Sequence, residues 1–293
     1  MTGNQEKISP LATVRNFRDV ASLVKDVNKG LLFRSAQLDN ASREELDLLR
    51  EQYKIRSVID LRGMKPWPLV STIQSKSNHD ADYVPQYPDM VASTSILGLQ
   101  LHYITLAGPQ YREQVAKRFG VWDQAKDTTK VTPSPANDLK QEWLKSTTTK
   151  MTEDRMPVYE TVIDHSIPQM KAIFKILADP SSYPVLILNI YGLDFVSMIV
   201  ILILLVLRVD KDSIHRDYMQ DYVELADIKQ ERIEFNRSIG ILKAETVEPY
   251  LPFVDSLDQY LQDKYGGVEK YLLHLGLSES EIRAMRDTLR SGS

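Results

Sequence analysis

Short apolar runs alternate with helical patterns along the chain. Three of these runs are compact and bounded by polar or turn residues, as buried strands usually are. They are residues 31–33, 57–61 and 101–106. Between the first two, residues 39–53 carry apolar side chains at helical spacing, and Ser42 with Glu45 makes a capping box. A strand, a helix and a strand in this order predict a parallel sheet with crossover helices.

The strongest pattern lies at residues 184–208. An apolar run at 185–188 passes through a short turn and becomes a nearly unbroken apolar helix, predicted over 196–207. A buried strand, a tight turn and a helix start form a site, because the first backbone N–H groups of the helix have no partner within it and point at the turn. Such turns usually carry polar, cationic or nucleophilic groups. This turn is mostly apolar.

The remaining segments indicate more helices and one insertion. Helices are predicted over 164–178, 211–226, 228–239 and 254–265, with two short ones within 268–289. Residues 111–156 scatter apolar side chains among charged ones, with a loop at 127–138. We expect a single α/β domain over 1–293, with 111–156 as a largely helical lid or as an insertion without a functional role.

Composition excludes several classes of protein. With 293 residues and 43% apolar content the chain can bury a sizeable core, and its net charge of -4 gives no general attraction for nucleic acid or for an anionic membrane. The apolar helix after the turn is shorter than the roughly 20 residues of a membrane span, and the first ten residues do not resemble a secretion signal. We therefore expect a soluble, cytoplasmic protein with no membrane span; the sequence does not indicate its oligomeric state.

The chain contains no cysteine, which excludes disulfides, thiolate nucleophiles and Cys-ligated metals. Its five histidines show no ligand spacing, and we expect no metal. No glycine-rich nucleotide motif is present, and we expect no cofactor.

Five segments in a fixed order carry a resemblance to a known family. They are NFRDV (16–20), GLLFRSAQL (30–38), SVIDLR (57–62), PVLILNIYGLDFVSMIVILILLVLRV (184–209) and DKYGGVEKYLLHLGL (263–277). This order resembles fungal and bacterial members of the tyrosine/serine phosphatase family, which use a cysteine nucleophile. The resemblance implies a phosphatase-like α/β fold, with a central, mostly parallel sheet flanked by helices.

The turn departs from the family at the residues that carry the chemistry. The family has His-Cys, three residues that include a Gly, Lys-Asp-Arg, and then Thr-Gly. Here Asn189 takes the place of the nucleophilic Cys and Phe195 the place of the phosphate-binding Arg, while Gly192 and Asp194 match. The family reaction needs a thiolate to attack phosphorus and a guanidinium to hold the phosphate oxygens. Neither group is present, so phosphoester hydrolysis by the family mechanism is excluded.

Two functions from different classes remain open. The first is a catalytically dead pseudophosphatase that acts as a binding or scaffold protein. The second is an enzyme whose pocket takes an apolar small molecule and catalyses an isomerisation, a dehydration or a cyclisation, including a pericyclic one of the Diels–Alder type, on a polyketide or terpenoid intermediate of fungal secondary metabolism. The second hypothesis names as catalytic groups Asn189, Tyr191 and Asp194, and as substrate-binding groups in the turn Ile190, Leu193 and Phe195.

Five further side chains are candidates for substrate contact, each with a structural alternative. Arg34 and Arg62 either face the pocket mouth or form structural ion pairs. His165 either contacts the ligand or caps a helix start. Trp122 and Trp143 either cover an apolar ligand or pack within the insertion.

Overall fold

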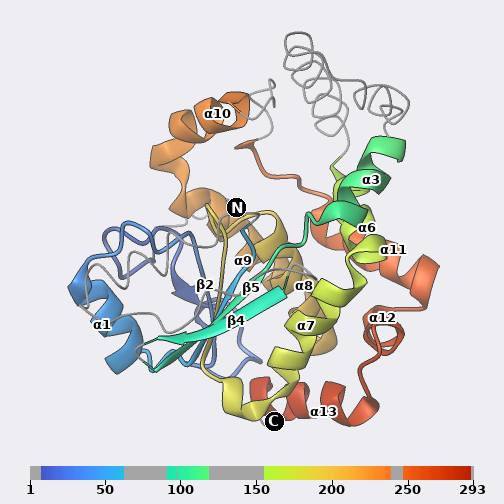
Figure 1. The fold of residues 1–293 in the computed structure, drawn as a ribbon, viewed down its shortest axis with the longest axis horizontal. Coiled ribbons are helices and arrows are strands. Elements are labelled where there is room, and N and C mark those ends of the chain that lie inside the picture. Colours follow the sequence, from blue (N-terminus) through green and yellow to red (C-terminus); the bar gives the residue numbers. More distant parts are fainter. Residues whose placement is uncertain (1–7, 63–90, 97, 119–154, 239–246, 292–293) are drawn as a thin grey trace.

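The computed structural model of the chain describes residues 8–62, 91–96, 98–118, 155–238 and 247–291. Within them, one sheet is covered on one face by most of the helices, and on the other by a layer of loops with the helix at residues 43–51 (Figure 1). The strands are β1 (Arg18–Asp19), β2 (Leu32–Ser35), β3 (Ser57–Asp60), β4 (Val91–Ile96), β5 (Leu99–Ile104) and β6 (Val185–Leu188). The helices are α1 (Arg43–Glu51), α3 (Pro109–Arg118), α6 (Met156–His165), α7 (Ile167–Ala178), α8 (Phe195–Val206), α9 (Lys211–Glu224), α10 (Lys229–Ser238), α11 (Phe253–Tyr265), α12 (Val268–His274) and α13 (Glu279–Leu289).

The sheet has the strand order β1-β2-β6-β3-β5-β4. Its four inner strands, β2, β6, β3 and β5, are parallel, and the edge strands β1 and β4 are antiparallel to their neighbours. This confirms the predicted mostly parallel α/β sheet. The register pairs Leu188 with both Ser35 and Asp60, so three strands end side by side where the turn after β6 begins. The carboxyl ends of parallel strands are where α/β folds place their sites.

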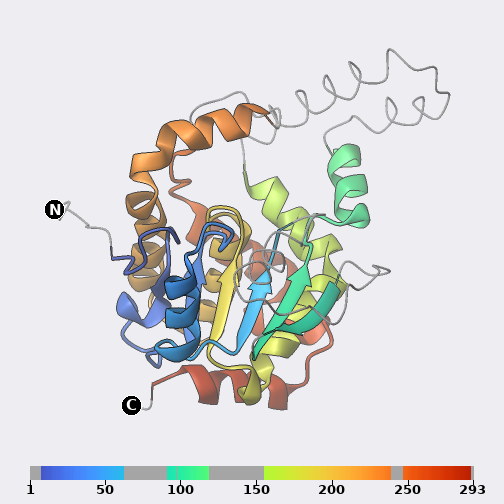
Figure 2. The same ribbon diagram turned by 60° about the vertical axis from the view of Figure 1, so that its left-hand side comes forward.

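Each face of the sheet has its own core. On one face Val185 and Ile187 pack with α7 and α8, and on the other Leu186 and Leu188 pack with the layer that contains α1. Such continuous apolar strands are typical of parallel strands covered on both sides. Helix α8 is apolar on all sides because the sheet and other helices surround it. Figure 2 shows α10 beyond the carboxyl ends of the parallel strands and α13 beyond their amino ends.

One predicted helix is wrong, and one strand was missed. The helix predicted over 164–178 is two helices: α6 ends at His165, and α7 begins at Ile167 with Pro168 in its first turn. Proline has no N–H group to continue the hydrogen bonds of α6, so a new helix starts there. His165 therefore lies at the end of a helix and caps no helix start. Strand β4 was not predicted, because its sequence VASTSI is rich in small polar residues.

The predicted lid over 111–156 is described only at its two ends. Helix α3 covers its start and α6 begins at its last residue, while Trp122 and Trp143 lie outside the described residues. The division into one domain with a lid stays a prediction. In the described part of the chain, no helix combines the length and the apolar character that a membrane crossing requires.

Candidate functional site

The turn between β6 and α8, residues 189–194, folds around the side chain of Asn189. Its Oδ1 accepts hydrogen bonds from the backbone N–H groups of Tyr191 (3.2 Å), Gly192 (2.6 Å) and Leu193 (3.3 Å). Its Nδ2 donates to the Leu193 carbonyl at 2.7 Å. Successive backbone N–H groups that converge on one point form an anion-binding nest. Here the uncharged amide oxygen of Asn189 occupies that point.

Strand β2 packs against the turn. Gly192 has a φ of +70°, and a Cβ atom there would lie 2.7 Å from the backbone carbon and oxygen of Ser35. Only glycine therefore lets the turn approach β2 this closely. Asn16 donates to the carbonyls of Tyr191 and Gly192, both at 3.2 Å, and Arg34 donates to the Gly192 carbonyl at 2.8 Å.

A buried ion network lies beneath the turn. Arg18 binds Asp217 (2.9 Å) and Asp221 (2.8 Å), and Arg34 binds the same two carboxylates at 2.6 Å each. All four side chains are at most 2% exposed. Burial alone would raise the pKa of the Asp217 carboxyl, but the two guanidiniums outweigh it and lower this pKa below its ordinary value. Arg34 also donates to Ser197 Oγ at 2.8 Å, so it holds the start of α8 as well as the turn.

Asp194 closes the turn at the N-cap position of α8, with a φ of 54° and a ψ of -102°. Its side chain makes no capping bond; instead Oδ1 accepts from the Tyr159 hydroxyl at 3.3 Å. The residue is exposed to solvent, although many protein atoms lie in the neighbourhood of its carboxyl group. This desolvation raises the pKa of Asp194, against the lowering effects of Arg232, Arg155 and the Tyr159 hydrogen bond.

Four tyrosines lie near enough to Asp194 to be influenced by its charge, and one of them, Tyr159, hydrogen-bonds to its carboxyl group. Burial raises the pKa of all four, and the negative charge of Asp194 raises it further. They are Tyr111, Tyr159, Tyr218 and Tyr222. The Tyr218 and Tyr222 hydroxyls are hydrogen-bonded to each other at 3.1 Å. These tyrosines stay protonated at neutral pH, so each hydroxyl keeps a proton to donate, and Tyr159 donates its proton to Asp194.

Phe195, in the position of the family's cation, is part of an aromatic cluster. It meets Tyr111 and Tyr159 edge to face, with ring centroids 6.4 and 6.3 Å away. The cluster continues through Phe253, whose ring centroid is 4.3 Å from Tyr159 and 5.4 Å from Tyr218. Edge-to-face contacts of this kind add to the stability of aromatic groups.

The other turn residues point in different directions. Tyr191 lies edge-on to Phe235 of α10, with centroids 5.6 Å apart. Leu193 is buried and packs with Leu225 and Ile228 near the end of α9. Ile190 is half-buried, and its carbonyl accepts a backbone hydrogen bond from residue 37 at 3.3 Å.

Arg34 supports the turn as described above, whereas the candidates Arg62 and His165 do not join this group. The Arg62 guanidinium binds Asp60 (2.6 Å) and Asp39 (2.7 Å), so it forms structural ion pairs at the end of β3. His165 lines a cavity of about 320 Å³ between α3 and α6, together with Asp164 and other residues outside the turn. No turn residue lines it.

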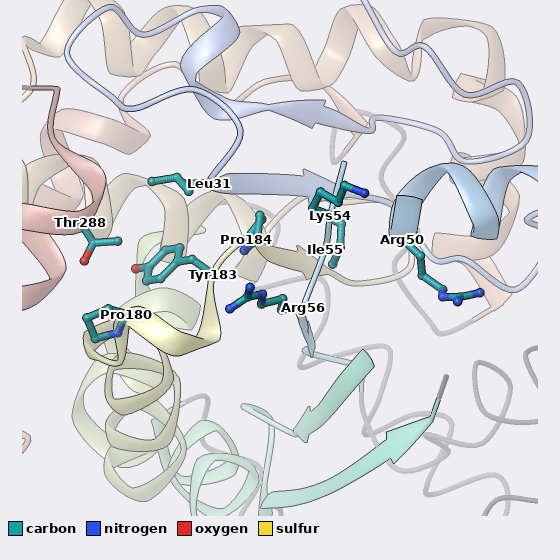
Figure 3. A pocket seen from close by; sticks show the side chains of 9 residues that line it. All are labelled: Leu31, Arg50, Lys54, Ile55, Arg56, Pro180, Tyr183, Pro184 and Thr288. Atoms are coloured by element: carbon teal, nitrogen blue, oxygen red, sulfur yellow. The ribbon is translucent and has the colours of Figure 1, made fainter. Parts of the chain in front are cut away.

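A second cavity, of about 470 Å³, lies at the ends of the strands opposite to the turn (Figure 3). Pro184, which directly precedes β6, lies in its wall, so this cavity is at the amino ends of the parallel strands. Three cationic side chains and an apolar wall line it. The lining residues are Leu31, Arg50, Lys54, Ile55, Arg56, Pro180, Tyr183, Pro184 and Thr288.

Sequence reasoning missed the groups that other elements bring to the turn. Helix α9 supplies Asp217 and Asp221 to the ion network and Tyr218 and Tyr222 to the tyrosine group. The available signal was spacing: both pairs are four residues apart, so each lies on one helix face. Arg232 of α10 gave no such signal.

The fold and the turn define a class of protein. A parallel sheet whose central strand enters a turn of convergent N–H groups, followed by a buried helix, is the architecture of α/β phosphatases with a phosphate-binding loop. In a comparison with known protein families, residues 9–291 match the family described as "Tyrosine phosphatase family". Since the match covers nearly the whole chain, this protein belongs to the tyrosine phosphatase family. A search among curated proteins found no significant match.

Proposed function

We propose that this chain does not hydrolyse phosphoesters, and that it binds an apolar small molecule beside Asp194 and catalyses a non-hydrolytic isomerisation or cyclisation of it. The observation that carries the proposal is the different state of two turn residues, Asn189 and Asp194. The anion nest is filled by Asn189, whereas Asp194 is an acid of raised pKa among tyrosines.

The loss of hydrolysis follows from what the turn offers a phosphate. An incoming dianion would have to displace the Asn189 amide from three N–H groups, and it would find Phe195 where the family has a guanidinium. No thiolate is available to attack phosphorus, because the chain has no cysteine. Binding and chemistry are therefore both disfavoured.

An apolar ligand fits the surroundings of Asp194 better than a phosphate does. Small-molecule sites combine apolar and aromatic walls with a few placed polar groups. Phe195, Tyr111 and Tyr159 supply an aromatic wall, and the Tyr159 hydroxyl positions the carboxyl group. A raised pKa brings a carboxyl group closer to the pH at which it can both give and take a proton, so Asp194 is the proposed general acid or base.

The other proposed roles follow from the contacts of each side chain. Asn189 is already bonded within the turn, so it acts as a positioning residue. Tyr191 is half-buried at the edge of the turn and faces α10, where it offers a ring and a hydroxyl to a ligand. With no nucleophile, acceleration comes from holding the reactive conformer and from one proton transfer. A polyketide or terpenoid intermediate of fungal secondary metabolism has the required apolar body.

The test is to incubate the purified protein with unsaturated polyketide and terpenoid intermediates and to follow isomers of unchanged mass by chromatography. We expect Asp194→Asn to abolish turnover and Asp212→Asn, a change on the exposed side of α9, to retain it. Equal turnover by the wild type and Asp194→Asn would contradict the role of Asp194.

A binding or scaffold protein is the second candidate, and one observation favours it. A turn whose N–H groups are satisfied by its own side chain is stable without any ligand. This candidate predicts no conversion of any apolar intermediate and tight capture of a protein or a phosphorylated ligand. The same purified protein distinguishes the two candidates.

A further inference from the structure

Arg232 on α10 is a buried cation with few partners. The residue is 5% exposed, and among the described residues it makes one hydrogen bond, from Nη2 to the Val247 carbonyl at 3.2 Å. The guanidinium lies over the Tyr222 ring (5.6 Å to the centroid) and the Tyr191 ring (6.0 Å). Among the described residues, no carboxylate forms an ion pair with it. No nitrogen of Arg232 is among the buried side-chain atoms without a hydrogen-bond partner in the described part of the chain, so those that make no hydrogen bond reach the surface.

Arg232 lies beside the turn and the tyrosine group near Asp194, because its guanidinium is over one ring of each, Tyr191 and Tyr222. Its charge is the largest influence that lowers the pKa of Asp194, and it also lowers that of Tyr191. The two charged groups nevertheless form no ion pair, which places their nearest nitrogen and oxygen atoms more than 4.0 Å apart. A guanidinium carries five N–H donors, and one hydrogen bond leaves most of them available to a ligand.

We propose that Arg232 binds an anionic oxygen group of the ligand, such as a carboxylate or an enolate, while the aromatic wall holds the apolar body. This deepens the proposed function, on whose site it rests, by naming the ligand as an apolar acid. Phe195 stands where the family has a cation, whereas α10 places the cation of Arg232 outside the filled nest. The planar fork of arginine matches a planar oxygen pair, and its charge strengthens each hydrogen bond.

Two fluorescent probes separate this inference from the proposed function. 1-Anilinonaphthalene-8-sulfonate is an aromatic anion, and N-phenyl-1-naphthylamine has the same aromatic body without the charge. We expect both to bind the wild type, the anion more tightly, and Phe195→Ala to weaken both. Arg232→Gln should lower the affinity for the anionic probe by roughly tenfold or more, since a hydrogen bond to a charged group is lost. It should leave the affinity for the neutral probe unchanged.

Arg237→Gln is the matched control, because Arg237 is an exposed arginine on the same helix; it should change neither affinity. Circular dichroism checks that each variant is folded. Equal anion affinity in Arg232→Gln and the wild type overturns the inference, as does an equal loss for both probes, which would mean that Arg232 only packs the site. Failure of the neutral probe to bind the wild type contradicts the apolar site of the proposed function, and failure of both probes contradicts both proposals.

Discussion

A single residue, Asn189, decides what the turn can hold. Its amide oxygen lies within hydrogen-bond distance of three N–H groups that would otherwise bind an anion, and its amide nitrogen binds the turn's own carbonyl. Asparagine thereby stabilises the turn without a ligand. The amide is a poor nucleophile, so asparagine at this position offers phosphorus no attacking group, and it also occupies the point where the N–H groups converge.

Removing this side chain should therefore destabilise the turn and open the nest. We expect Asn189→Ala to lower the free energy of unfolding by about 1–3 kcal/mol, because partly buried donors lose their acceptor. Adding tungstate should raise the melting temperature of Asn189→Ala, because the anion binds the opened nest. It should leave the melting temperature of the wild type unchanged. Equal stability of the variant and the wild type would contradict the contacts described for Asn189.

The pKa of Asp194 sets a second prediction, on stability against pH. Its folded-state pKa is raised above 3.8, so its contribution to stability is complete below 3.8 and is lost as the pH rises through the folded value. At neutral pH the ionised carboxylate therefore costs stability. We expect Asp194→Asn to raise the melting temperature at neutral pH, with a difference that shrinks toward zero in acid. A lower melting temperature for Asp194→Asn at neutral pH would show that Arg232 and Arg155 outweigh the desolvation of the carboxylate.

At the scale of elements, the unit of β6, turn and α8 depends on its fit against β2. The sequence predicted this unit with nearly the observed boundaries, because a buried strand followed by an apolar helix has a strong pattern. It did not predict the bonds of Asn189 inside the turn. Side-chain periodicity carries no information about a turn whose shape depends on contacts with β2 and α9.

Gly192 tests this fit. Gly192→Ala should destabilise the fold by about 1–2 kcal/mol for its positive φ and by about 1–3 kcal/mol more for the clash with Ser35. Gly30→Ala is the control: its φ is +76°, but a Cβ atom there would meet nothing within 4 Å. Chemical denaturation should show a larger loss for Gly192→Ala. Equal losses would mean that the turn can move away from Ser35 at no measurable cost in stability.

The ion network joins α9 to β1 and β2. Asp221→Asn should lower the free energy of unfolding by about 3–5 kcal/mol, because it leaves two buried guanidiniums undercompensated. Asp227→Asn, at the exposed ion pair with Arg15, should change it by less than about 1 kcal/mol. Comparable losses in denaturant for both variants would contradict the buried network.

The same network should make the fold acid-sensitive. The pKa of Asp217 is lowered below 3.8 in the folded state, so its contribution is present above 3.8 and is lost as the pH falls through the folded value. We expect stability to drop in that acid range, and the drop to be smaller in Asp217→Asn. Unfolding curves recorded along an acid series check this; an equal drop in both proteins would assign the sensitivity to other carboxylates.

At the scale of the whole molecule, the family's fold is kept while its catalytic groups are replaced. The order of elements and the parallel sheet were predictable, because each element has its own apolar pattern and the family's segments follow in order. The site was predictable only where it is continuous in sequence, at 189–195. Tyr159, Tyr218 and Arg232 reach it from three separate helices, and only tertiary packing brings them together.

Two substitutions put the family's reacting groups back into the turn. We expect Asn189→Cys combined with Phe195→Arg to return detectable hydrolysis of an aryl phosphate, since the turn keeps its nest and its support by Arg34. Either single variant should stay inactive, because attack and phosphate binding are both required. Hydrolysis by the unaltered protein in the same assay would contradict our exclusion of the family mechanism.

The most direct test of the account follows the backbone amide of Gly192 by nuclear magnetic resonance during a titration with tungstate, a mimic of phosphate. If the Asn189 amide fills the nest, this resonance stays unchanged in the wild type and moves in a saturable way in Asn189→Ala. Saturable movement in the wild type would show that the nest is open to an anion, and the claim that this turn no longer holds phosphate would be wrong.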